Sequence, residues 1–214
     1  MKMDDIKDVN VCPCSESLYI KPMKINYKQN GIQKAWDAMK VHDSVVIVVF
    51  NKTRNVFILV KQFRPAIYLT CAEPEEKDGL TVIDTTKYPG SLGVTYELCA
   101  GIIDKNHSTE EIAQMEILEE CGYKVPLDSI EKVASYRNGV GTTGSVQTMF
   151  FVEVTDAMKV GEGGGVAQEG EMIDVIEVPV KEGRDFVKNE KYNIPLPVLF
   201  GISWFYENKY SLYC

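Results

Sequence analysis

The sequence is poor in histidine and contains no long apolar or basic run. Its 214 residues include two histidines, His42 and His107, and six scattered cysteines at positions 12, 14, 71, 99, 121 and 214. This pattern makes a zinc site improbable, and we expect reduced, mostly buried thiols. No apolar stretch approaches the roughly 20 residues of a membrane-spanning helix. The polar N-terminal segment lacks the layout of a secretory signal. We therefore expect no membrane association and a cytoplasmic location.

Basic side chains are also in the minority, 23 against 31 acidic ones, which gives a formal net charge of -8. Such a surface repels nucleic-acid backbones, so no nucleic acid partner is expected. A phosphate-bearing small molecule remains a possible ligand where a metal ion and a few arginines reverse the local field. The length suffices for one core and a small accessory element.

Strand and helix signals are mixed along the chain. Residues 19–27 alternate like exposed strands before a turn at Gly31, and residues 44–50 form a β-branched run typical of a buried central strand. A turn at 51–55 leads to a returning strand at 56–60. Further strands are predicted at 94–100, 146–152 and 173–178, solvated or flexible loops at 73–79 and 161–165, and a terminal helix within 197–205. Without regular βαβ alternation, this order predicts a layered α+β fold.

Another helix is predicted between an N-cap at Ser108 or Thr109 and a stop at Gly122. Its apolar stripe would contain Ile112, Met115 and Leu118. Residues three and four apart share one helix face, so three glutamates converge: Glu116, Glu119 and Glu120. Alone, this pattern is typical of a solvated acidic face or of a site for a hard divalent cation.

The spacing around that helix resembles the Nudix box, G-x5-E-x7-R-E-U-x-E-E-x-G-U, where U is a bulky aliphatic residue. Six residues match without a gap: Gly101, Glu116, Ile117, Glu119, Glu120 and Gly122. Three positions differ, because His107 replaces the first glutamate, Met115 the arginine and Tyr123 the last aliphatic residue. Residues 60–65 and 97–101, with Glu169 and Glu171, are similar to the nucleoside diphosphate sugar branch of the family.

This resemblance implies a Nudix α/β/α sandwich with a mixed sheet at residues 43–214. It also implies a small N-terminal β element at residues 1–42 that pairs the chain into a homodimer. The implied cofactor is Mg²⁺, with Mn²⁺ as a substitute. The implied metal ligands are the Ala100 carbonyl, Glu116, Glu120 and Glu171. Metal ions would neutralise the charge that repels an incoming nucleophile from a diphosphate and would orient the attacking water.

The resemblance also suggests roles around the metal. Glu169 is the expected general base, with Glu119 as the alternative. Arg64 is expected to hold a phosphate, although a structural ion pair is the other reading. The other expected substrate-binding residues are Glu97, Trp36 and Tyr27. Core or interface packing is the more common role of such aromatic residues.

The implied activity is hydrolysis of the pyrophosphate bond of nucleoside diphosphate sugars, with UDP-glucose giving UMP and glucose 1-phosphate. Hydrolysis of ADP-ribose or ADP-sugars is the nearest alternative, and a non-catalytic nucleotide-sugar binder is another. A separate base has no use in a binder, so the full set of glutamates favours an enzyme. The glycine-containing loop at 139–144 is a weak candidate for the pocket wall.

Overall fold

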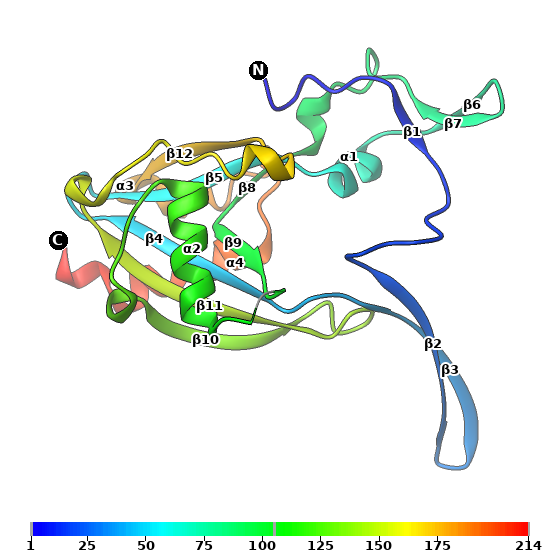
Figure 1. Cartoon of the computed structure of the whole chain (residues 1–214), viewed down its shortest axis with the longest axis horizontal. Helices are drawn as coiled ribbons and strands as arrows, with labels where there is room; N and C mark the ends of the chain where they lie inside the picture. The colour runs from blue at the N-terminus through cyan, green and yellow to red at the C-terminus, as the bar shows by residue number, and fades with distance from the viewer. Residues whose placement is uncertain (1, 105, 214) are drawn as a thin grey trace.

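The computed structural model describes residues 2–104 and 106–213, with the backbone alone at Glu169. Its largest sheet has the order β10-β11-β4-β5-β12, with β8 beside β5 and β9 beside β4 (Figure 1). Strand β11 runs parallel to β4 and the other neighbours are antiparallel. The strands of this sheet are β4 (Ser44–Asn51), β5 (Val56–Phe63), β8 (Val94–Glu97), β9 (Cys99–Ile102), β10 (Glu131–Asn138), β11 (Ser145–Val154) and β12 (Ile173–Pro179). The mixed α+β class expected from the sequence is confirmed.

Strand β4 is buried on both faces because it lies in the middle of the sheet. Val45, Ile47 and Val49 pack in one core cluster with residues of α2 (Thr109–Cys121). The alternate residues of β4 pack in a second cluster with residues of α4 (Leu196–Asn208). Helix α3 (Val180–Phe186) follows β12 on this second face. The predicted central strand and terminal helix are therefore confirmed.

The single strand predicted at 94–100 is two strands, β8 and β9, separated at Leu98. Strand β8 pairs with the end of β5, whereas β9 pairs with the start of β4. Strands β4 and β5 pair with each other only from Val49↔Ile58 to Asn51↔Val56. The chain therefore has to pass from one strand to the other at Leu98, which the sequence pattern could not reveal.

Helix α2 begins as predicted. The Ser108 side chain accepts a hydrogen bond from the Glu111 amide, and the Glu111 carboxylate accepts one from the Ser108 amide, which completes a capping box. Gly122 ends the helix in the left-handed conformation. The predicted apolar stripe is partly wrong, because Leu118 is exposed and Ile117 is buried instead.

Two smaller sheets lie beside the main body. Strands β2 (Lys21–Gln29) and β3 (Ile32–Lys40) form a hairpin that extends away from it (Figure 1). Strand β1 (Val9–Val11) instead pairs with β7 (Leu80–Ile83), which pairs with β6 (Glu75–Lys77). The predicted loop at 73–79 thus contains a strand and enters a tight hairpin. Helix α1 (Pro65–Cys71) packs beneath this sheet through Tyr68.

In the part of the chain that the structure describes, no helix is long and apolar enough to cross a membrane. Cys99 and Cys121 are buried, but Cys12, Cys14 and Cys71 are exposed. The expectation of mostly buried thiols is therefore wrong for these five cysteines.

Candidate active site

Two glutamates of α2 converge on strand β9. The amide of Ala100 donates a hydrogen bond to Glu120 Oε2 at 3.0 Å. The Glu116 carboxylate lies against Gly101, where an added Cβ would be 2.0 Å from Glu116 Oε1. Only glycine permits that approach, because any side chain would occupy the place of the carboxylate. Gly101 pairs with Val45, so both carboxylates are anchored near the start of β4.

The electrostatic surroundings of Glu120 disfavour an isolated negative charge. The pKa of Glu120 is raised to about 8, mainly by burial; the carboxylates of Glu116 and Glu171 contribute to this rise, and the hydrogen bond from the Ala100 amide opposes it. A pair of like-charged carboxyl groups in a buried place is well suited to a cation, which reverses the sign of their interaction.

Arg64 and Glu97 lie beside this pair and bind each other in a bidentate manner. Arg64 Nε donates to Glu97 Oε1 and Arg64 Nη2 to Glu97 Oε2, both at 2.8 Å. These hydrogen bonds raise the pKa of Arg64 above its ordinary value, and the charges of Glu97, Glu120 and Glu171 add to the effect. Burial would raise the pKa of Glu97, but its hydrogen bonds and the charge of Arg64 outweigh burial and hold this pKa below its usual range.

Thr95 is a residue of this site that the sequence reasoning missed. Its hydroxyl donates to Glu97 Oε1 at 2.5 Å, while its side chain is buried. Residues two apart on a strand share a face, so the proximity of Thr95 to Glu97 was readable from the spacing. The hydroxyl fixes the carboxylate that in turn orients the Arg64 guanidinium.

Glu171 and Glu169 belong to the loop before β12. The amide of Val166 donates to Glu171 Oε2 at 2.8 Å. Glu171 is close enough to influence the pKa values of Glu120 and Arg64. Glu169 ends a short 3-10 helix (Ala167–Glu169), and its side chain lies outside the described part of the structure. Glu119 is half-buried on α2, between the two glutamates that approach β9.

Trp36 and Tyr27 are not brought to these residues within the chain. Both belong to the β2–β3 hairpin, which extends away from the main body (Figure 1). Both side chains are exposed. Trp36 Nε1 donates to the carbonyl of Gly141 at 2.8 Å, so the hairpin holds the loop at 139–144. The Met39 amide makes a second bond to this loop, to the carbonyl of Thr142.

Among residues 2–104 and 106–213, no three side chains of histidine, cysteine, aspartate or glutamate are gathered closely enough to hold an ion on their own. Magnesium commonly takes only one or two carboxylates from the protein and completes its shell with water and substrate phosphates. Glu116 and Glu120 beside the β9 backbone fit that donor set. His107 is exposed at the start of α2, with Nδ1 3.7 Å from Glu111 Oε2, whereas Met115 packs against the core.

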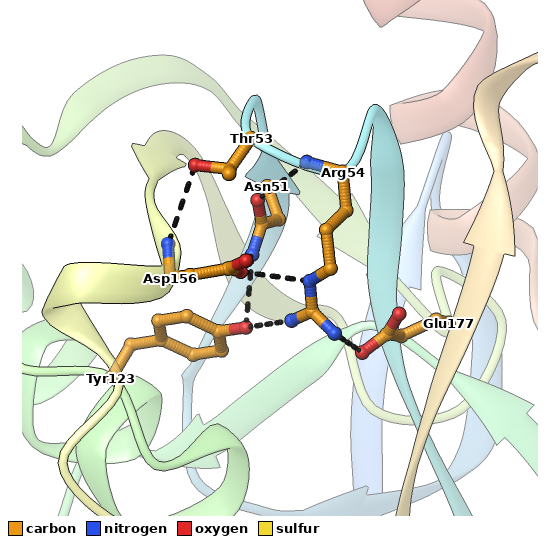
Figure 2. A network of polar contacts seen from close by, with 6 residues as sticks. All are labelled: Asn51, Thr53, Arg54, Tyr123, Asp156 and Glu177. Carbon is orange, nitrogen blue, oxygen red and sulfur yellow. Dashed lines mark hydrogen bonds and ion pairs between the residues drawn. The ribbon is translucent and has the colours of Figure 1, made fainter.

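Tyr123, which replaces the last aliphatic residue of the box, belongs to a polar network at the other end of the sheet (Figure 2). Arg54 Nη2 donates to its hydroxyl at 2.8 Å, and Asn51 Nδ2 donates to it at 3.2 Å. Arg54 also forms ion pairs with Asp156, at 2.8 Å, and with Glu177. The phenol ring itself is buried, so this residue both packs and anchors the end of the box segment.

An acidic helix packed on a mixed sheet, with glutamates directed at a glycine-containing strand, is the arrangement expected of a Nudix protein. No family model matches the chain. The chain is 46% identical over 216 residues to uridine diphosphate glucose pyrophosphatase NUDT14 of Bos taurus, with 95% of this chain and 96% of that protein covered. It is 45% identical over 212 residues to the Mus musculus protein of the same name, with the same coverage. A GDP-mannose pyrophosphatase of Cronobacter sakazakii is 28% identical over 146 residues, which cover 68% of this chain and 64% of that protein. The chain belongs to the Nudix hydrolase family.

Proposed function

We propose that this protein hydrolyses the pyrophosphate bond of nucleoside diphosphate sugars in a magnesium-dependent reaction, with UDP-glucose as the preferred substrate. The observation that carries the proposal is the convergence of Glu116 and Glu120 on Ala100 and Gly101. The similarity to two proteins named uridine diphosphate glucose pyrophosphatase supports the choice of substrate.

Glu116, Glu120, Glu171 and the Ala100 carbonyl would hold Mg²⁺, or Mn²⁺ in its place. The ion would neutralise diphosphate charge and lower the pKa of a bound water. Glu169 is assigned as the base that takes the proton of the attacking water, and Glu119 is the alternative. Attack at one phosphorus breaks the bond to the bridging oxygen, so UDP-glucose and water give UMP and glucose 1-phosphate.

Arg64 would bind a phosphate oxygen of the substrate. Glu97 accepts hydrogen bonds from Nε and Nη2, the two donors on one edge of the guanidinium, and the hydrogen bond from Thr95 keeps that carboxylate from turning away. The guanidinium is thus fixed before the substrate arrives, which reduces the entropy lost on binding. Glu97 therefore serves substrate binding through the orientation of Arg64.

A substrate panel tests the proposal. UDP-glucose, ADP-ribose and GDP-mannose are compared on one preparation, with nucleoside monophosphate and phosphate-sugar products measured separately. We expect the highest kcat/KM for UDP-glucose, with some activity on the others because all share the diphosphate. A clear preference for ADP-ribose would overturn the substrate assignment, and no magnesium-dependent product from any of them would overturn the enzymatic function.

We also propose that the three layers form the Nudix α/β/α sandwich, with residues 43–214 as the hydrolase domain and residues 1–42 as an accessory element that forms a homodimer. The two faces of the hairpin differ. Met23, Ile25 and Trp36 lie on one face, while Lys24 and Asp37 form an ion pair on the other. An isolated two-stranded hairpin is marginally stable in water. A second copy covering the apolar face would stabilise the hairpin and bring Trp36 and Tyr27 of one protomer toward the site of its partner.

Light scattering on the full chain tests the assembly. We expect the mass of a dimer at micromolar protein and of a monomer in Ile25→Lys, with Lys28→Gln on the polar face as the matched control. A monomeric wild-type protein with full activity would contradict this proposal.

The proposed location remains the cytoplasm.

A further inference from the structure

A glycine-rich loop, residues 161–165, is attached by its backbone to the last turn of α2. The amide of Gly164 donates to the carbonyl of Glu120 at 2.9 Å, and the amide of Gly165 donates to the carbonyl of Glu119 at 3.1 Å. The last four carbonyls of a helix have no donor within the helix itself. The loop supplies two of the missing donors, at Glu119, the alternative base, and at Glu120, one of the expected metal ligands.

Close approach of the two segments requires glycine. A Cβ on Gly163 would lie 2.2 Å from the carbonyl oxygen of Glu120 and 2.8 Å from the carbonyl carbon of Cys121. These are backbone atoms of a packed helix, so they cannot move aside as the end of a flexible side chain would. The φ of +73° at Gly163 adds strain for any other residue.

The same loop fixes the carboxylate of Glu171. A Cβ on Gly165 would lie 2.6 Å from Glu171 Oε2, the oxygen that accepts the hydrogen bond of the Val166 amide. The carbonyl of Gly164 in turn accepts a bond from the amide of Ile173, at the start of β12. Backbone contacts therefore lead without interruption from the end of α2 to the loop acid.

We propose that Gly163 and Gly165 are positioning residues, which let the glycine loop close on α2 and so set Glu171 at a fixed place relative to Glu120. The amides of Val160 and Gly161 also bind the carbonyl of Gly122, so the chain that enters the loop is held at the end of α2 as well. The contacts of residues 163–165 are the ones that continue from the helix to Glu171. The catalytic consequence rests on the proposed function, whereas the attachment of the loop can be measured without any substrate.

Two variants and a matched control test the proposal. Gly163→Ala obstructs the approach to α2, and Gly165→Ala displaces the Glu171 carboxylate. Gly161→Ala is the control, because a Cβ there meets nothing within 4 Å. Amide hydrogen exchange of the full chain, without substrate, should show slow exchange at Gly164 and Gly165 in the wild type and in the control, and at least ~10-fold faster exchange in Gly163→Ala.

Kinetics with UDP-glucose and Mg²⁺ form the second readout. We expect kcat, referred to the folded fraction measured by near-ultraviolet circular dichroism, to fall at least ~30-fold in Gly163→Ala and Gly165→Ala, because a misplacement of about 1 Å can cost two orders of magnitude. The control should stay within about 2-fold, and KM should change by less than about 3-fold because Arg64 is untouched.

Equal kcat values in the two variants and in Gly161→Ala would overturn the proposal, as would unchanged exchange at Gly164 and Gly165 in Gly163→Ala. If Gly163→Ala does not fold, Gly165→Ala decides the catalytic consequence alone. If the wild type hydrolyses no nucleoside diphosphate sugar, the proposed function fails, but the exchange experiment still decides whether the loop is attached as inferred.

Discussion

The two ends of strand β4 each carry a cluster of charged side chains, and the clusters are built differently. At the far end, Arg54 is surrounded by Asp156, Glu177 and the Tyr123 hydroxyl, so positive and negative groups face one another (Figure 2). At the site end, Glu116 and Glu171 act unfavourably on buried Glu120. Charged groups that are paired with opposite charges stabilise a fold. Like charges held close together instead favour the binding of a ligand of opposite sign.

The two positions of β4 beside the clusters, Val46 and Asn51, are five residues apart, which corresponds to about 17 Å along a strand. Both clusters are nevertheless connected to the same segment of chain. Helix α2 carries Glu116 and Glu120, and Tyr123 follows directly after its end. The far cluster therefore contacts the residue that follows the C-cap of the helix, whereas the site cluster lies on the helix itself.

The largest expected effect is at the site end. Glu120→Gln should lower kcat at least ~100-fold, because it removes a charged metal ligand and little volume. The fold should remain intact, since a neutral amide is easier to bury than a charged carboxylate. Magnesium titrations of activity, together with thermal unfolding, measure both effects. Activity near that of the wild type at limiting Mg²⁺ would show that the metal assignment is wrong.

A smaller effect is expected from Arg64→Lys. Lysine keeps the positive charge but cannot bind Glu97 in a bidentate manner, so the cation is no longer held in one orientation. We expect kcat/KM for UDP-glucose to fall by about 10- to 50-fold, mainly through KM. An unchanged KM would favour the alternative that Arg64 forms a structural ion pair, and in that case the free energy of unfolding would decrease instead.

At the far end we expect a substitution to change the free energy of unfolding and to leave catalysis nearly unchanged. Arg54→Met removes the cation shared by Asp156 and Glu177, and we expect the free energy of unfolding to decrease by about 2 kcal/mol, with the exposure of these groups limiting the loss. Because the site is remote, kcat should stay within about 3-fold of the wild type. Urea unfolding and steady-state kinetics on one preparation measure the two quantities. A loss of kcat/KM larger than that of Arg64→Lys would remove the distinction between the two ends.

The smallest effect is expected for Tyr123→Phe. It keeps the buried ring and removes only the hydroxyl that Arg54 and Asn51 contact. The expected decrease in the free energy of unfolding is about 1 kcal/mol, which corresponds to about 2–4 °C in Tm for a protein of this size. Activity should not change measurably. Calorimetry checks the first expectation, and a Tm equal to that of the wild type would mean that the hydroxyl network does not stabilise the fold.

Several local features could be predicted because short-range chemistry controls them. The β-branched run of β4, the N-cap at Ser108 and the left-handed Gly122 were all readable from residue type and spacing. The break at Leu98 was not readable, because it depends on where β4 and β5 separate. The strands at residues 75–77 and 80–83 were missed for a similar reason, since the sheet they form with β1 is completed by residues about 70 positions earlier in the chain.

By itself, the sequence determined which acidic residues of the helix form the site, because helical periodicity alone places Glu116 and Glu120 on one face. The spacing of the box residues also identified the family. Only the tertiary structure decided where those carboxylates lie. Gly101 admits Glu116, the Ala100 amide binds Glu120, and the glycine loop closes on the end of α2. These are contacts between backbone and side chains from separate elements. They follow from the packing of the helix on the sheet, which no local pattern of residues specifies.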